Sequence, residues 1–170
     1  MKIVRVDSPL DMRPARLALM ADSTLRPDRR PLFLPEGDWE CQVRVAIRID
    51  RLGKAVSRKF AGRYYSELAP VNYLYPLEQQ PWPDMTDDAL VIGKWEPAGD
   101  LNLTMAEESA SFKFDRDAFD SLLAHLSEHT TFKTGDIVIL PDVMLRYKPR
   151  LDLHVEVLQG DDPALEFNIK

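Results

Sequence analysis

The sequence is poor in cysteine, glycine and positive charge. Its 170 residues include one cysteine, Cys41, and seven glycines. A lone cysteine excludes a disulfide within the chain and any metal cluster that needs several thiolates. The 22 lysines and arginines are outnumbered by 28 aspartates and glutamates, which gives a net charge of −6. A surface that neutralises a run of phosphates usually carries the opposite balance, so we expect no nucleic-acid partner.

Long apolar runs are missing as well. No stretch approaches the ~20 apolar residues that a membrane-spanning helix needs. Residues 1–11 also lack the apolar region of a signal peptide. The sequence therefore predicts a cytoplasmic protein with no membrane partner. Its length is typical of a single domain, which we expect to span residues 1–170.

Alternation of apolar and polar residues predicts several strands. The clearest covers residues 42–50, where valines and isoleucines on one face alternate with mostly polar residues on the other. Shorter strands are expected at residues 2–6, 137–140, 151–158 and 165–169. Residues 7–39 contain five prolines, so we expect them to be irregular.

Two helices are expected among the strands. The first covers about residues 56–68, where Phe60, Tyr64 and Leu68 recur every four residues. The second covers residues 115–129, with an aspartate as N-cap and an apolar stripe of phenylalanine and leucines. Strands interrupted by two helices indicate an α+β or mainly β fold.

Common catalytic motifs are absent from the sequence. It contains no glycine-rich phosphate loop, no G-x-S-x-G and no H-E-x-x-H. His125 and His129 have the i, i+4 spacing that can chelate a metal, but we expect no acidic or cysteine partner at a suitable spacing. We therefore interpret them as a polar helix end. The acidic pairs at residues 87–88 and 161–162 are interpreted as turns.

Several segments carry more specific motifs. Residues 51–54 (RLGK) are followed by residues 58–67 (RKFAGRYYSE), and residues 132–139 (FKTGDIVI) follow the second expected helix. Weaker motifs lie in residues 21–35 and 165–170. In this order the segments resemble the fumarylacetoacetate hydrolase family. The resemblance implies a mixed β-sandwich roll with two or three short helices, usually dimeric.

The resemblance also implies a site. Members of the family bind Mg²⁺ or Mn²⁺ through an E-x-E pair on a strand and an aspartate further on, and they hydrolyse, decarboxylate or isomerise 2-oxo acids and diketo acids. An ungapped match places the pair on Gln42 and Arg44, and a two-residue shift places it on Glu40 and Gln42. The third ligand falls on Tyr73, or on Asn72 with a one-residue shift. Since a guanidinium is always charged and accepts no hydrogen bond, it would repel a cation, and we predict no metal and no other cofactor.

Other parts of the family's chemistry have no counterpart in the sequence. No lysine lies in residues 83–88, directly after the proline–tryptophan pair at residues 81–82, and no glycine loop follows residues 137–139. The N-terminal acid–base histidine is missing as well. The sequence therefore predicts a catalytically degenerate protein with a binding, structural or regulatory role. We expect it to be a homodimer or the partner of an intact family member. The proline-rich residues 70–82 either contact that partner or cover the core with their tyrosines.

Two questions stay open at this point. Arg44 can replace the cation and hold a small anionic ligand such as a carboxylate, or it can pair with a nearby carboxylate such as Glu40. The alternative function is that of a diverged Mg²⁺- or Mn²⁺-dependent hydrolase, decarboxylase or isomerase of 2-oxo or diketo acids. Its site would be rebuilt from Glu40, Asp87 and Asp142.

Overall fold

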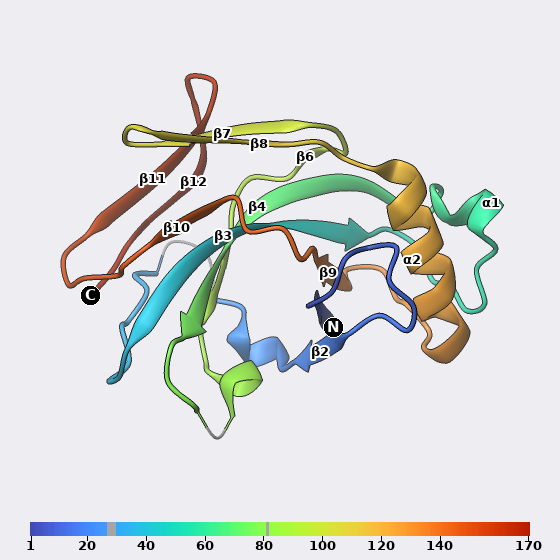
Figure 1. Cartoon of the computed structure of the whole chain (residues 1–170), viewed down its shortest axis with the longest axis horizontal. Helices are drawn as coiled ribbons and strands as arrows, with labels where there is room; N and C mark the ends of the chain where they lie inside the picture. Colours follow the sequence, from blue (N-terminus) through green and yellow to red (C-terminus); the bar gives the residue numbers. More distant parts are fainter. Residues whose placement is uncertain (27–29, 81) are drawn as a thin grey trace.

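The computed structural model describes residues 1–26, 30–80 and 82–170. Pro27, one of the five prolines of residues 7–39, and Pro81, in the expected partner segment at residues 70–82, lie outside the described residues. Across the described residues, the chain forms twelve strands in two sheets and two α-helices (Figure 1). The expected mainly β, α+β fold is confirmed. No helix within these ranges is long and apolar enough to cross a membrane.

The larger sheet is built around two long antiparallel strands, β3 and β4. Its strand order is β2-β1-β9-β3-β4-β5, with β10 paired to β3 and β6 paired to β4. The strands are β1 (Ile3–Val6), β2 (Leu17–Met20), β3 (Trp39–Ile49), β4 (Tyr65–Pro76), β5 (Leu90–Ile92), β6 (Glu96–Pro97), β9 (Ile137–Ile139) and β10 (Leu145–Tyr147). Figure 1 shows β3 and β4 curving through the middle of the molecule.

The smaller sheet consists of two hairpins in the order β12-β11-β7-β8. Its strands are β7 (Leu101–Met105), β8 (Glu108–Phe112), β11 (His154–Gln159) and β12 (Asp162–Asn168). In Figure 1 this sheet lies at the upper left, and helix α2 (Arg116–His129) lies at the opposite end of the molecule. Two short 3-10 helices, η1 (Asp22–Thr24) and η2 (Pro83–Met85), lie close to each other.

Alternate residues of β3 pack into two different hydrophobic cores, one on each face of the strand. Val43 and Ile47 belong to a large apolar cluster that also includes α2 and the inner residues of the smaller sheet. Ala46 belongs to a smaller cluster on the other face, together with Val71 and Tyr73 of β4. Because side chains on a strand alternate between its faces, the even-numbered residues of β3 all lie on the side of the smaller cluster.

One of the two expected helices is confirmed. Helix α2 begins where the sequence predicts, and the carboxylate of its N-cap Asp115 accepts a hydrogen bond from the backbone N–H of Ala118 at 2.9 Å. The helix expected at residues 56–68 is wrong, because α1 ends after four residues (Arg58–Ala61) and the chain enters β4 at Tyr65. Leu68 pairs with Ile47 in the sheet, so tertiary pairing overrides the local helical spacing.

The strands predicted from alternation are found, with shifted ends. The expected strand at residues 151–158 begins only at His154, since Asp152 adopts a left-handed backbone conformation with φ of 60° in a turn. The expectation that residues 7–39 are irregular is wrong at β2, a short strand that pairs with β1. Strands β4, β5, β6, β7, β8 and β10 were not predicted. Most of these strands are short, and the alternation within them is too brief to show.

Candidate functional site

One face of β3 carries a row of polar side chains. Glu40, Gln42 and Arg44 follow each other at every second position and therefore point to the same side. The amide oxygen of Gln42 accepts hydrogen bonds from Arg44 Nε at 3.1 Å and Nη2 at 2.7 Å, and its amide nitrogen donates to Glu40 Oε1 at 2.8 Å. Gln42 is 3% exposed and Arg44 is 7% exposed. These bonds hold the guanidinium of Arg44 in one orientation.

Tyr73 joins this row from the neighbouring strand. It lies opposite Gln42 in the β3–β4 register, and the guanidinium carbon of Arg44 lies 5.8 Å from the centre of its ring. The Tyr73 hydroxyl accepts a hydrogen bond from Arg5 Nη1 at 2.6 Å. Burial raises the pKa of Tyr73 to about 12, although the charge of Arg5 partly opposes the shift. Tyr73 is therefore a neutral phenol at ordinary pH.

Arg5 connects the row to two carboxylates. Its Nε and Nη2 donate to the two oxygens of Asp7 at 2.8 and 3.0 Å, and its Nη1 donates to Asp84 Oδ1 at 2.5 Å. Burial alone would lower the pKa of Arg5, but its contacts with Asp7, Tyr73 and Asp84 outweigh that effect and raise it. Arg5 is thus a firmly held cation between two carboxylates.

Arg44 is less well neutralised than Arg5. Its Nη1 lies 3.7 Å from Asp7 Oδ1, which is an ion pair but too long for a hydrogen bond. Burial lowers the pKa of Arg44, and the charge of Arg5 lowers it further, with Asp7 and Tyr73 opposing only in part. Additional negative charge beside Arg44 would therefore be stabilised.

An open hollow of about 450 Å³ lies over this part of the sheet. It is lined by Arg5, Asp7, Gln42, Arg44, Tyr75, Pro141 and Arg146. Arg146 comes from β10, where it pairs with Gln42, and it donates to Glu40 Oε1 at 2.5 Å. Among the described residues that line the hollow, three are arginines and one is an aspartate. The hollow is therefore rich in positive charge, and the buried side chains of Gln42 and Arg44 are part of its lining.

Asn72 lies on the opposite face of the sheet. Its amide nitrogen donates to Cys41 Sγ at 3.6 Å, and its oxygen accepts a hydrogen bond from the Tyr147 hydroxyl at 2.7 Å. Burial raises the pKa of Cys41 and also that of Tyr147. Of the two positions considered for the third ligand, only Tyr73 shares the face of Gln42 and Arg44.

The two remaining acidic candidates are exposed and lie outside the hollow. Asp142 lines a neighbouring hollow of about 500 Å³, which shares Asp7 and Pro141 with the first. Asp87 lies in the turn before β5. The structure thus brings Glu40, Gln42, Arg44 and Tyr73 together and leaves Asn72, Asp87 and Asp142 apart.

Sequence reasoning missed several residues of the site. Arg5, Asp7 and Asp84 are brought in by β1 and by η2, and Arg146 is brought in by β10. Arg5 is the polar residue of an otherwise apolar short strand, which is the one local signal that marks it. The other three lie in segments with no local pattern that connects them to β3.

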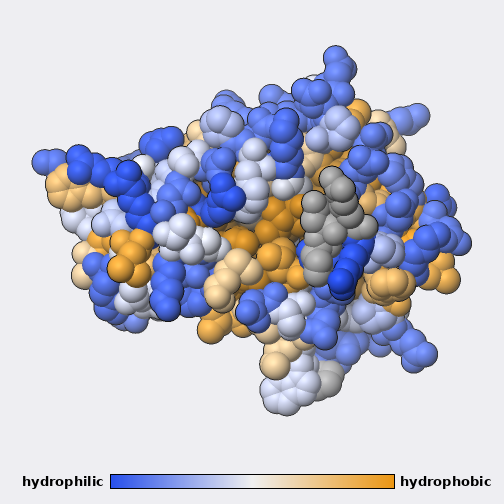
Figure 2. All heavy atoms as spheres, turned by 180° about the vertical axis from the view of Figure 1, so that it is seen from behind, coloured by the Kyte–Doolittle hydropathy of each residue, from blue (hydrophilic) through white to orange (hydrophobic). Residues whose placement is uncertain are grey.

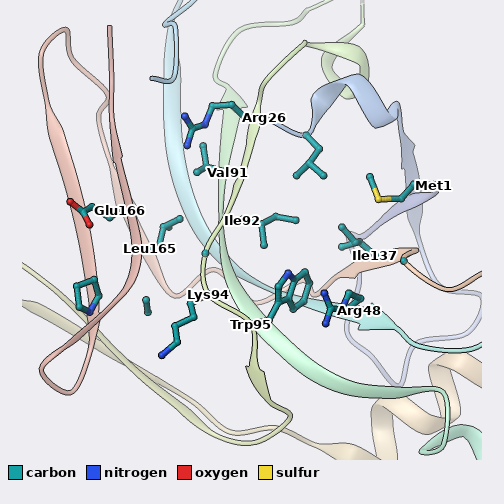
Figure 3. Close-up of a pocket in the computed structure, with 15 residues that line it drawn as sticks. Met1, Arg26, Arg48, Val91, Ile92, Lys94, Trp95, Ile137, Leu165 and Glu166 are labelled. Carbon is teal, nitrogen blue, oxygen red and sulfur yellow. The ribbon is translucent and has the colours of Figure 1, made fainter. Parts of the chain in front are cut away.

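A second hollow of about 580 Å³ lies further along the same row of β3, at Arg48 (Figure 3). Arg48 stacks on Trp95, with 5.0 Å from the guanidinium carbon to the ring centre, and forms an ion pair with Glu67. Lys94, at the rim, pairs with Glu96 at 3.0 Å. Figure 3 shows Arg48 and Trp95 side by side, with Ile92 above them. Arg48 and Lys94 thus both have carboxylate partners, and Arg26 also lines this hollow.

The residues at the first hollow do not fit Mg²⁺ or Mn²⁺. Hard cations need several oxygen ligands, of which carboxylates are the strongest. The guanidinium of Arg44 occupies one of the matched positions, and the carboxylate of Glu40 already accepts hydrogen bonds from Gln42 and Arg146. Arg5 separates the nearby carboxylates of Asp7 and Asp84.

Comparison with solved structures identifies the fold. The chain aligns over 99% of its length with 92% of a protein described as belonging to the fumarylacetoacetate hydrolase family from Yersinia pestis CO92, at a TM-score of 0.78 and 20% identity. It also aligns over 99% of its length with 73% of 2-hydroxyhepta-2,4-diene-1,7-dioate isomerase from Mycobacterium marinum, at a TM-score of 0.78 and 16% identity.

A third solved structure was determined with a metal and a small acid bound. Fumarylpyruvate hydrolase from Pseudomonas aeruginosa, in complex with Mn²⁺ and pyruvate, aligns with 99% of this chain over 89% of its own length, at a TM-score of 0.75 and 13% identity. No protein-family model and no curated protein matches the sequence. The chain has the fold of the fumarylacetoacetate hydrolase family, as the resemblance predicts.

Proposed function

We propose that this chain is a non-enzymatic binding protein that uses the fumarylacetoacetate hydrolase fold to hold a small carboxylate at Arg44. The observation that carries this proposal is the buried guanidinium of Arg44, which is oriented by Gln42 and incompletely neutralised by Asp7. A guanidinium in this position attracts an anionic ligand and donates hydrogen bonds to it, in place of the charge of a divalent cation.

The hydrogen bonds of Arg44 indicate where the ligand binds. Nε and Nη2 are directed at Gln42, whereas Nη1 lies 3.7 Å from Asp7 Oδ1, beyond hydrogen-bond distance. Arg146 lines the same hollow from β10. A ligand carboxylate placed between Arg44 and Arg146 would accept charge-assisted hydrogen bonds from both.

The lining also restricts the ligand class. Tyr75 and Pro141 offer a small apolar surface beside the three arginines. A short acid with a second oxygen, such as a 2-oxo acid, matches this combination of cations and limited apolar surface. Because a structural neighbour binds pyruvate, pyruvate and oxaloacetate are suitable probes.

Calorimetric titration with pyruvate and with oxaloacetate tests the proposal. It is carried out in the presence of EDTA, so that no metal contributes. We expect saturable binding by the native chain and at least about tenfold weaker binding by Arg44→Gln. Arg58→Gln, an exposed arginine on α1, is the matched control and should bind normally. Absence of saturable binding, or equal affinity in Arg44→Gln, would overturn the proposal.

The alternative of a diverged metal-dependent enzyme rests on one observation. Three carboxylates lie beside the arginines of the hollow. Asp7 and Asp84 are bonded to Arg5, and Glu40 is bonded to Arg146. A rearrangement that released them would supply oxygen ligands. Elemental analysis after soaking in Mn²⁺, combined with an assay for turnover of oxaloacetate and acylpyruvates, decides between the two. A full equivalent of tightly held Mn²⁺ with turnover would favour the enzyme.

We also propose that the chain pairs with a second copy or with an intact relative. The segment suspected from its prolines exposes Tyr75, Leu77 and Trp82, the last at 71%. The space-filling view from behind shows hydrophobic residues gathered in the centre of that face, with hydrophilic residues around them (Figure 2). Exposed apolar side chains of this size are typical of interfaces. Light scattering of the purified chain, alone and mixed with an intact relative, measures the assembly.

A further inference from the structure

A second cluster of potential ligands lies at the C-terminal end of α2, on a different element from the hollow at Arg44. His125, Glu128 and His129 each offer one ligand atom, and these three atoms lie within 4.8 Å of one another. The two imidazole rings face each other edge to face, with 5.4 Å between their centres. The expectation that these histidines have no acidic partner is wrong, because Glu128, one turn after His125, completes the group.

The helix geometry explains why the three side chains converge. Residues three and four apart on an α-helix are neighbours on its surface, so His125 meets both Glu128 and His129. The end of the helix is firmly held: Ser127 Oγ donates to the carbonyl of Ala124 at 2.8 Å and accepts from the backbone N–H of Val56 at 2.8 Å. The backbone that carries the three ligands is therefore fixed before any ion binds.

Local electrostatics also favour a cation at this position. The carbonyl groups at the C-terminal end of a helix carry partial negative charge, and Glu128 adds a full one. Lys2, which contacts the residues that follow the helix, is already engaged. Its ammonium donates to Thr130 Oγ1 at 3.1 Å and to the carbonyl of Thr131, and it pairs with Asp136 at 3.5 Å.

The donor types select the class of ion. Two imidazole nitrogens and one carboxylate oxygen are typical ligands of Zn²⁺, with bonds of about 2.0–2.2 Å. Mg²⁺ and Ca²⁺ prefer all-oxygen sites. The three ligand atoms already lie within 4.8 Å of one another, and His129 and Glu128 are exposed and free to rotate toward a shared ion.

We propose that His125, Glu128 and His129 form a binding site for a divalent transition metal of the Zn²⁺ class, with water in the remaining coordination position. This site is separate from the carboxylate site at Arg44 and does not depend on it. Two of its three ligands are exposed and all three come from a single helix, so we expect micromolar rather than nanomolar affinity.

Histidine-selective NMR of the native chain tests the proposal directly, since the sequence contains three histidines. Addition of one equivalent of Zn²⁺ should shift the ring signals of His125 and His129 and leave those of His154 in place. Mg²⁺ should shift none of them.

Variants provide the second measurement. His125→Ala and His129→Ala should each reduce Zn²⁺ affinity by about tenfold or more in calorimetry, and Glu128→Gln by a smaller factor. Alanine is the best helix former, so these variants should remain folded, as circular dichroism would verify. His154→Ala is the matched control and should bind normally. Unshifted ring signals, or affinity that survives both α2 histidine variants, would overturn the proposal.

Discussion

The amide oxygen of Gln42 accepts two hydrogen bonds from the guanidinium of Arg44, at 3.1 and 2.7 Å. Both residues are buried on the same face of β3, so the positive charge of Arg44 is fixed at one point of the sheet. A neutral amide is a weak counterpart for a buried cation, since it supplies a dipole rather than a charge. This imbalance leads to the first two predictions.

Gln42→Glu should weaken binding of a carboxylate ligand. The substitution keeps the shape of the side chain and places a full negative charge against Arg44, which would satisfy the guanidinium and repel the ligand. We expect at least about a tenfold loss of pyruvate affinity in calorimetry. Gln79→Glu, on an exposed loop, adds the same charge elsewhere and should bind normally. Unchanged affinity in Gln42→Glu would argue against a ligand at Arg44.

Asp7→Asn should have the opposite effect on binding. Asp7 is bonded to Arg5 and lies 3.7 Å from Arg44 Nη1, so its charge competes with an anionic ligand for both arginines. Its removal should strengthen pyruvate binding several-fold while lowering the free energy of unfolding, because the buried Arg44 loses its ion pair and Arg5 loses one of its two carboxylate partners. Asp11→Asn is the control. A stability loss without tighter binding would mean that Asp7 and the arginines serve only the fold.

Tyr147→Phe should destabilise the protein without affecting the carboxylate site. The Tyr147 hydroxyl donates to the oxygen of Asn72, a residue fully buried on the far face of the sheet from Arg44. An unpaired buried carbonyl costs about 1–3 kcal/mol. Urea unfolding should show this decrease, and Tyr64→Phe is a comparison variant on a half-buried tyrosine. A loss of pyruvate binding in folded Tyr147→Phe would contradict the separation of the two faces.

Gly93→Ala should disrupt the contact between the two sheets. A Cβ at Gly93 would lie 2.1 Å from the backbone oxygen of Ala164, and the backbone there is held by a hydrogen bond from Lys94 N to the same oxygen at 2.7 Å. Relief requires movement of β12, which we expect to cost about 1–3 kcal/mol. Gly99→Ala meets its nearest atom at 3.8 Å and should be tolerated. Equal urea midpoints for the two variants would contradict this account.

The sequence anticipated those parts of the fold that local patterns encode. Alternation over residues 42–50, broken only at Ala46, fixes both the strand and the faces of Gln42 and Arg44, because the side-chain period of a strand is two. The N-cap and apolar stripe of α2 were equally clear. Where a pattern was short, as in β2 and β10, or where two periods competed, as around Leu68, local reasoning failed.

The candidate site was anticipated only on its own strand. Alternation placed Gln42 and Arg44 on one face, and the resemblance added Glu40, and Tyr73 or Asn72 without choosing between them. The β3–β4 register made that choice by placing Tyr73 opposite Gln42 and turning Asn72 into the core. Arg5, Asp7, Asp84 and Arg146 come from distant segments, and no local pattern in the sequence associates them with β3.

The sequence by itself therefore determined β3 and several shorter strands, the long helix and the presence of an arginine where a carboxylate was expected. Only the tertiary structure decided which groups surround that arginine and how far its charge is neutralised. The physical reason is that a side chain's direction follows from the periodicity of its own backbone, whereas its neighbours follow from strand pairing between segments far apart in the chain.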